Sequence, residues 1–169
     1  LLDALAQCPA EVNALIVGDG PHRDHLVQRA QELGLDSRVR FLPALPFTDL
    51  PVFKNAIDVF VLPSRTTRRW KEQFGRVIIE AHACGTPVIG SDSGAIPEVV
   101  GDGGWIIPER NPSALAQALE EAKESGTSQE RREAIVHRAR EHFSWRAVAS
   151  KYAEIYSGLI TGSRGQGNA

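Results

Sequence analysis

Two carboxylates, Glu72 and Glu80, stand eight positions apart around the expected start of an apolar helix at 75–84. At the rise of an α-helix, eight residues span roughly 12 Å. The positive end of a helix dipole between the two acids suits an anion such as a pyrophosphate. Carboxylates accept hydrogen bonds from the hydroxyl groups of sugars. Sugar, pyrophosphate and ribose in this order describe a nucleotide-sugar, which is the ligand class that we expect.

Each acid also has a simpler structural explanation. Glu72 could be a solvated acid whose charge suits the helix dipole. Glu80 interrupts an apolar run at 77–81 and needs a partner, which Arg76, one turn earlier, could supply. The functional alternative is that Glu80 accepts both hydroxyls of a ribose diol. The spacing alone leaves both alternatives open.

Two glycine-containing segments follow expected strands. Gly18 and Gly20 come directly after the strand expected at 12–17, but Arg23 stands where a dinucleotide fingerprint needs its third glycine. The segment therefore predicts a tight turn that a ligand can approach closely, and dinucleotide binding is rejected. The small residues at 91–95 could present backbone amides to a phosphate or form a capped loop.

A basic loop lies just upstream of Glu72 and contains Arg65, Arg68, Arg69 and Lys71. Such a run is usually a solvated surface. Because the loop follows a strand, contact with a phosphate or an anionic acceptor is the second interpretation, and the role of this loop stays open. The five histidines have no spacing typical of a metal site, and we predict no metal ligand.

Short apolar runs alternate with helical patterns along the chain. Strands are expected at 12–17, 39–42, 58–62, 86–90 and 105–107, and helices at 22–33, 50–55, 75–84, 95–100, 112–125, 129–142 and 145–160, with Ser144 as a helix cap. Strands that are apolar on both faces and separated by helices predict an α/β fold, a Rossmann-like doubly wound parallel sheet. Ligands of such folds bind at the carboxyl ends of the strands, where all the segments above fall.

Length and composition predict one globular domain at 1–160 and a flexible, Gly-rich tail at 161–169. A formal net charge of −2 argues against a nucleic-acid binder. The two cysteines lack metal or redox spacing, and the sequence contains no membrane-spanning run or signal peptide, so we expect a cytoplasmic protein. The chain contains no Met and begins within an expected helix, which predicts a piece of a longer protein.

Taken together, the ordered motifs resemble glycosyltransferase family 4, retaining enzymes of the GT-B fold. The resemblance covers the chain from about Leu1 through the final helix and matches the C-terminal, donor-binding half of such enzymes. The motifs are LIVGDGP at 15–21, VRFL at 39–42, DVFVLPS at 58–64, E-x7-EA at 72–81, ACGTPVI at 83–89 and G-x-IPE at 94–98.

The resemblance implies a role for each matching residue. Glu80 would hold the ribose hydroxyls, and Glu72 would be the catalytic residue beside the donor sugar. Gly18 and Gly20 would line the floor of the site. The remaining binding residues would contact the nucleobase from the strand at 39–42 and its end, or the sugar and pyrophosphate from the loop and helix after Glu72: Arg40, Phe41, Leu42, Pro43, Gln73, Phe74, Gly75, Arg76 and Val77.

The resemblance also implies a reaction. A hexose would pass from a nucleotide-sugar, UDP- or GDP-linked, to a glycan or lipid-linked acceptor by front-face displacement, with no metal or other cofactor. The acceptor would bind to a missing N-terminal domain, and the full-length enzyme could associate peripherally with a membrane. The family's upstream Arg and Lys, which grip the pyrophosphate, and the first strand of the domain are absent here, so the fragment alone is expected to be inactive. The alternatives are a GT-B-like nucleotide-sugar epimerase and a non-catalytic, flavodoxin-like nucleotide-binding module.

Overall fold

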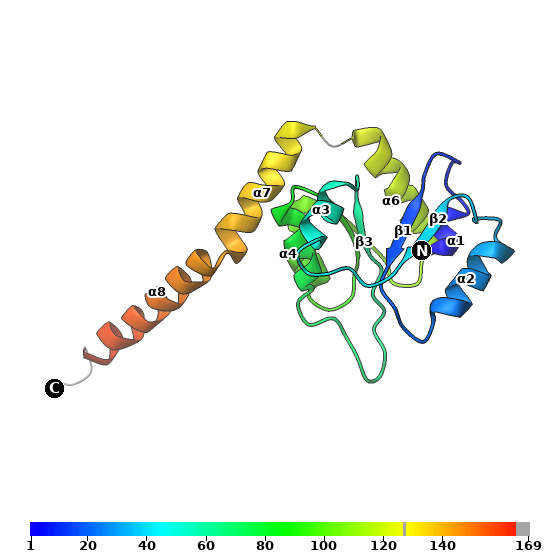
Figure 1. The fold of residues 1–169 in the computed structure, drawn as a ribbon. Helices are drawn as coiled ribbons and strands as arrows, with labels where there is room; N and C mark the ends of the chain where they lie inside the picture. The colour runs from blue at the N-terminus through cyan, green and yellow to red at the C-terminus, as the bar shows by residue number, and fades with distance from the viewer. Residues whose placement is uncertain (127, 165–169) are drawn as a thin grey trace.

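The computed structural model describes residues 1–126 and 128–164 (Figure 1). The helices are α1 (Leu2–Leu5), α2 (Arg23–Glu32), α3 (Leu50–Asn55), α4 (Arg76–Ala83), α5 (Ile96–Val100), α6 (Pro112–Ser125), α7 (Gln129–Phe143) and α8 (Trp145–Arg164), with a 3-10 helix η1 (Gly101–Gly103). The strands are β1 (Ala14–Val17), β2 (Val39–Leu42), β3 (Phe60–Leu62), β4 (Val88–Ser91) and β5 (Gly104–Ile107). Every expected strand and helix is present, and every bound except the end of the last helix lies within two residues of the expected one.

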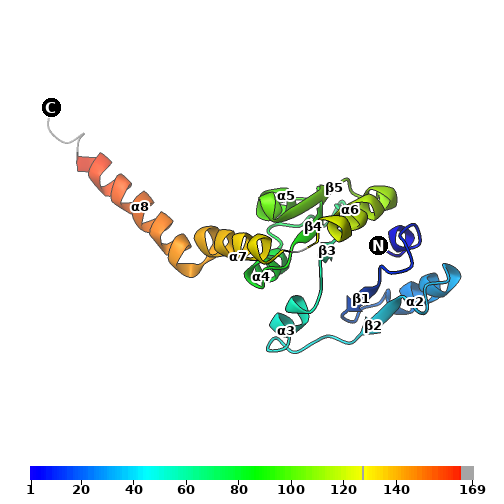
Figure 2. The ribbon, with the colours of Figure 1, turned by 90° about the horizontal axis from the view of Figure 1, so that it is seen from above.

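The strands are parallel, as predicted, but they form two sheets instead of one. β1 pairs with β2, and a separate sheet has the order β3-β4-β5. Figure 2 shows the two sheets as distinct blocks, joined by the segment that carries α3. The described strands therefore divide into two parallel sheets, because β1 and β3 form no ladder with each other.

Helices cover both faces of the larger sheet, as the doubly wound class requires. Val88 and Ile89 are neighbours in β4 and both are fully buried, but they face opposite layers. Val88 packs with α4 and α5 in one apolar cluster, and Ile89 packs with α6 in another. The α/β fold class with a parallel sheet and flanking helices is thus confirmed.

The last helix, α8, projects away from the body of the molecule (Figure 1). Its first turn is capped as predicted, because the Ala147 N–H donates to the Ser144 hydroxyl at 3.2 Å. Helix α8 continues to Arg164, which lies within the stretch expected as a tail, and residues 165–169 of that stretch lie outside the described residues. No helix in the described part of the chain is both long and apolar enough to cross a membrane.

His82 anchors the packing of α4 against η1 and α7. The side chain is fully buried, and neither ring nitrogen has a hydrogen-bond partner among the described residues. Gly103 lies against the ring so closely that a Cβ there would come within 2.5 Å of Cε1. Burial, and then the positive charge of Arg138, lowers the pKa of His82 to about 4.

This histidine makes stability depend on pH. Folded His82 stays neutral, whereas the unfolded chain binds a proton near the ordinary pKa of 6.5. The stability contribution is therefore complete above pH 6.5 and is lost as the pH falls toward 4. We expect the free energy of unfolding to be about 2 kcal/mol lower at pH 5 than at pH 7 through this group.

Urea unfolding at both pH values measures this difference. His82→Gln should flatten the dependence, and the matched control, His25→Gln at an exposed position of α2, should preserve it. The same pH dependence in His82→Gln as in the wild type would contradict the assignment.

Candidate functional site

Helix α4 begins between the two acids, at Arg76, as the sequence predicts. Gly75 precedes it with φ 76°, and the Glu72 carboxylate closes the turn by accepting hydrogen bonds from the N–H groups of Gly75 at 3.0 Å and Phe74 at 3.4 Å. The N–H groups of Arg76 and Val77 have no hydrogen-bond acceptor among the described residues. The start of α4 thus has backbone donors available to an anion, reinforced by the helix dipole.

The backbone of Glu72 is held by the turn after β4. The Ala95 N–H donates to the Glu72 carbonyl at 3.3 Å. Gly94 has φ 61°, and a Cβ there would lie 1.7 Å from the same carbonyl oxygen. Only glycine fits this contact. One amide of the 91–95 segment therefore fixes Glu72 and is not free for a phosphate.

Glu80 is paired, but not with Arg76. Its Oε2 accepts a hydrogen bond from the Nζ of Lys54 on α3, so the i, i+4 pairing with Arg76, one of the two alternatives that the sequence left open, does not form. Lys54 is 4% exposed, and its Nζ lies 5.9 Å from the centre of the Phe60 ring. The Glu80 side chain remains 32% exposed, and its Oε1 has no hydrogen bond among the described residues. Glu80 can therefore accept further donors while Lys54 fixes its position.

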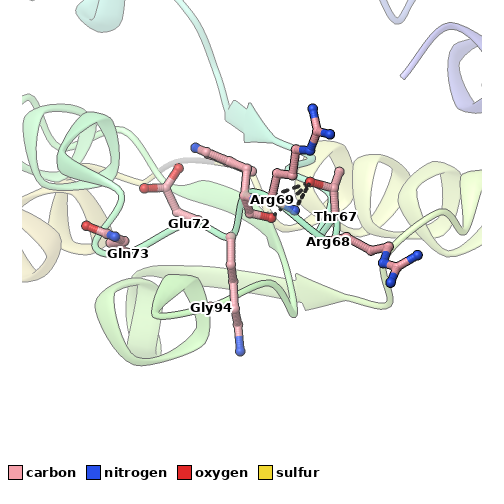
Figure 3. A pocket seen from close by; sticks show the side chains of 8 residues that line it. Thr67, Arg68, Arg69, Glu72, Gln73 and Gly94 are labelled. Atoms are coloured by element: carbon pink, nitrogen blue, oxygen red, sulfur yellow. Dashed lines mark hydrogen bonds between the residues drawn. The ribbon is translucent and has the colours of Figure 1, made fainter.

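Two pockets adjoin these acids. A pocket of about 530 Å³ includes Glu72 and Gln73 and extends over the basic loop (Figure 3). A small hollow of about 50 Å³ lies between α3 and α4, and Glu80 and Lys54 line it together with Phe47 and Cys84. The two acids therefore line different hollows: Glu72 lines the one over the basic loop before α4, and Glu80 lines the one between α3 and α4.

The expected nucleobase residues lie at the carboxyl ends of β1 and β2. The Gly18 N–H donates to the Leu42 carbonyl at 3.1 Å, and a Cβ at Gly18 or Gly20 would meet nothing within 4 Å. At the end of β2, Arg40 and Pro43 are exposed and Phe41 and Leu42 are half-buried. Neither of the two pockets includes these residues. The structure thus groups Glu72 with Gln73, and Glu80 with Lys54, but leaves the β1–β2 residues apart because the sheet is divided.

Sequence reasoning missed two contributors to this region. Lys54 lies 26 positions from Glu80, and no local periodicity links them. Glu109, after β5, accepts hydrogen bonds from the backbone N–H and the hydroxyl of Thr66, and this bonding lowers the pKa of the Glu109 carboxyl. Both contacts depend on how the elements pack, which the sequence does not display.

The buried ion pair should contribute to folding. Lys54→Met leaves Glu80 without its cation, and because Glu80 is one-third exposed we expect a loss of only about 1–2 kcal/mol. A double-mutant cycle with Glu80→Gln, measured by chemical unfolding, should give a coupling energy of the same order. Lys151→Met, at an exposed position of α8, is the control. A coupling energy of zero would show that the pair does not stabilise the domain.

The comparisons with known proteins agree on one family. Residues 1–142 match the family model for glycosyl transferases group 1. The chain is 35% identical over 147 residues to the D-inositol 3-phosphate glycosyltransferase of Streptomyces bingchenggensis, covering 85% of this chain and 30% of that protein. It is 34% identical over 152 residues to the GDP-mannose-dependent alpha-(1-6)-phosphatidylinositol monomannoside mannosyltransferase of Mycolicibacterium smegmatis, covering 85% of this chain and 39% of that protein.

A solved structure supports the same relationship. HepE of Anabaena, in a crystal structure with UDP, superposes with a TM-score of 0.80 at 32% identity, over 94% of this chain and 44% of HepE. The chain thus spans less than half the length of each of these relatives. Its structural neighbours are glycosyltransferases of the GT-B type. The chain belongs to the glycosyl transferases group 1 family.

Proposed function

We propose that this chain is the donor-binding domain of a retaining glycosyltransferase that transfers a hexose from a UDP- or GDP-linked sugar to a glycan or lipid-linked acceptor. The observation that carries this proposal is the free start of α4, which offers the N–H groups of Arg76 and Val77 between two carboxylates. Membership of the transferase family supports this function over an epimerase or a flavodoxin-like module.

The proposed reaction uses the backbone amides at the start of α4 and the two acids, Glu72 and Glu80. The donor diphosphate binds at the amides of Arg76 and Val77, where the helix dipole favours negative charge. Glu72 lies on the sugar side and holds the donor sugar as the catalytic residue. Glu80, on the other side, accepts the ribose hydroxyls through the oxygen that Lys54 leaves open. The leaving diphosphate is thus stabilised where its charge develops.

Retention of configuration is part of the proposal. A retaining enzyme with a covalent intermediate needs a carboxylate nucleophile beside the reacting carbon. Among the described residues that line the larger pocket, Glu72 is the one carboxylate, and its Oε1 is engaged by two backbone amides. This arrangement supports front-face displacement, in which the diphosphate itself leaves and the acceptor arrives on the same side.

Other functions of the proposed enzyme belong to the whole protein, of which this chain is the donor-binding domain. We assign catalytic competence, the larger part of acceptor binding and any peripheral membrane association to the whole protein, in the cytoplasm. The nucleobase would contact Gly18, Gly20 and the end of β2 when the two sheets come together around a strand between β1 and β3. The free edges of these two strands support that arrangement. The chain alone should bind donor weakly and transfer nothing.

Calorimetric titration of the chain with UDP, GDP and ADP tests the donor site. We expect one of UDP and GDP to bind, and Glu80→Gln to weaken that binding about tenfold, because hydrogen bonds to a charged acceptor are lost. Glu124→Gln, at an exposed position of α6, should bind as the wild type does.

Stability should be measured in parallel, since Glu80→Gln also breaks the pair with Lys54. Equal affinity in Glu80→Gln and in the wild type would remove Glu80 from the site.

A further inference from the structure

The basic loop (residues 65–71) forms one wall of the larger pocket beside Glu72. The pocket is lined by Thr67, Arg68, Arg69, Trp70, Lys71, Glu72, Gln73 and Gly94. Its volume of about 530 Å³ is within the range of small-molecule sites. The donor site described above uses Glu72 and Gln73 at its edge and leaves the rest of this pocket unassigned.

The pocket is positively charged. Arg68, Arg69 and Lys71 are exposed, and none of them forms a salt bridge within residues 1–126 and 128–164. In Figure 3, Arg68 and Arg69 extend from the loop in different directions, and their guanidinium groups point away from each other. Cationic side chains without acidic partners favour an anion, and the planar guanidinium suits the oxygens of a phosphate.

The loop is held in shape by its own hydrogen bonds. The Thr67 N–H donates to the Trp70 carbonyl at 2.8 Å, and the Thr67 hydroxyl accepts from the N–H of Trp70 at 3.0 Å and of Arg69 at 3.3 Å. Thr66 is tied to Glu109 and to the buried Ser93. A loop fixed at both ends presents its side chains at a smaller entropic cost of binding.

Trp70 adds an apolar surface to this charged wall. Its side chain is half exposed, and it stands in the loop between the two arginines and Lys71. An indole beside cations suits a ligand that has both a ring or polyol body and an anionic group. This combination distinguishes the pocket from a merely solvated basic surface.

We propose that the basic loop binds the phosphate group of the acceptor, a phosphorylated sugar or polyol that is either soluble or the head group of an anionic lipid. The identification of the anion as part of the acceptor rests on the proposed function. The free amides of α4 and Glu80 serve the donor diphosphate and ribose, whereas this pocket opens from Glu72, on the sugar side.

Nitrogen-15 NMR of the chain tests this proposal through the indole N–H of Trp70, assigned by comparison with Trp70→Phe. Glucose 6-phosphate and inorganic phosphate should shift this signal, and glucose should not. The double variant Arg68→Gln/Arg69→Gln should bind glucose 6-phosphate about tenfold more weakly. Arg140→Gln, at an exposed position of α7, should leave the affinity unchanged. If vesicles of phosphatidylinositol broaden the Trp70 signal and glucose 6-phosphate does not shift it, the phosphate belongs to a lipid head group.

Titration with UDP and GDP on the same sample separates this site from the donor site. Shifts around Glu80 with Trp70 unchanged would support two sites. Competition between the nucleotide and glucose 6-phosphate would overturn the proposal and assign the loop to the donor diphosphate. No shift of Trp70 with any phosphate, or equal shifts in the arginine double variant, would also overturn it. Phosphate binding at Trp70 without nucleotide binding would support the anion site while contradicting the proposed function.

Discussion

The contact between the Glu72 carbonyl and Gly94 is the constraint on which the proposed site depends. The loop after β3 lies so close to the turn after β4 that the Glu72 carbonyl leaves no room for a side chain at Gly94. Glu72 is fixed there by its backbone, and its carboxylate then closes the turn at Gly75 from which α4 starts. The start of α4, with the N–H groups of Arg76 and Val77, is therefore held beside the turn after β4. Backbone packing thus fixes the position of Glu72 and of the start of α4.

The ion pair between Lys54 and Glu80 fixes the second acid of the proposed site. A carboxylate next to the apolar layer of α4 would be costly alone, and the buried Lys54 compensates for it. The pair is asymmetric, since Lys54 is buried while Glu80 is one-third exposed. This asymmetry keeps an acceptor oxygen at the surface in a fixed position. Pairing with Arg76 would have joined Glu80 only to its own helix. Lys54 instead joins α3 to α4.

Local patterns predicted the elements well. Helix α6 has the expected bounds because its signals are local: Asn111 caps its start by accepting from the Ala114 N–H at 3.0 Å, and Gly126 follows its end. The division of the sheet was not predicted, because strand pairing is a non-local property. The partner of Glu80 was not found from the sequence for the same reason: an i, i+4 neighbour such as Arg76 is visible in sequence and a lysine on another helix is not. Glu72, Gln73 and the basic loop were expected at one edge, and the structure gathers them in one pocket.

A crystal structure of the chain with the nucleotide-sugar that it binds would test the central claim most directly. The account predicts the diphosphate within hydrogen-bond distance of the N–H groups of Arg76 and Val77, with the ribose hydroxyls on Glu80 and the sugar beside Glu72. A diphosphate bound away from the start of α4, with Glu80 contacting Lys54 alone, would contradict it.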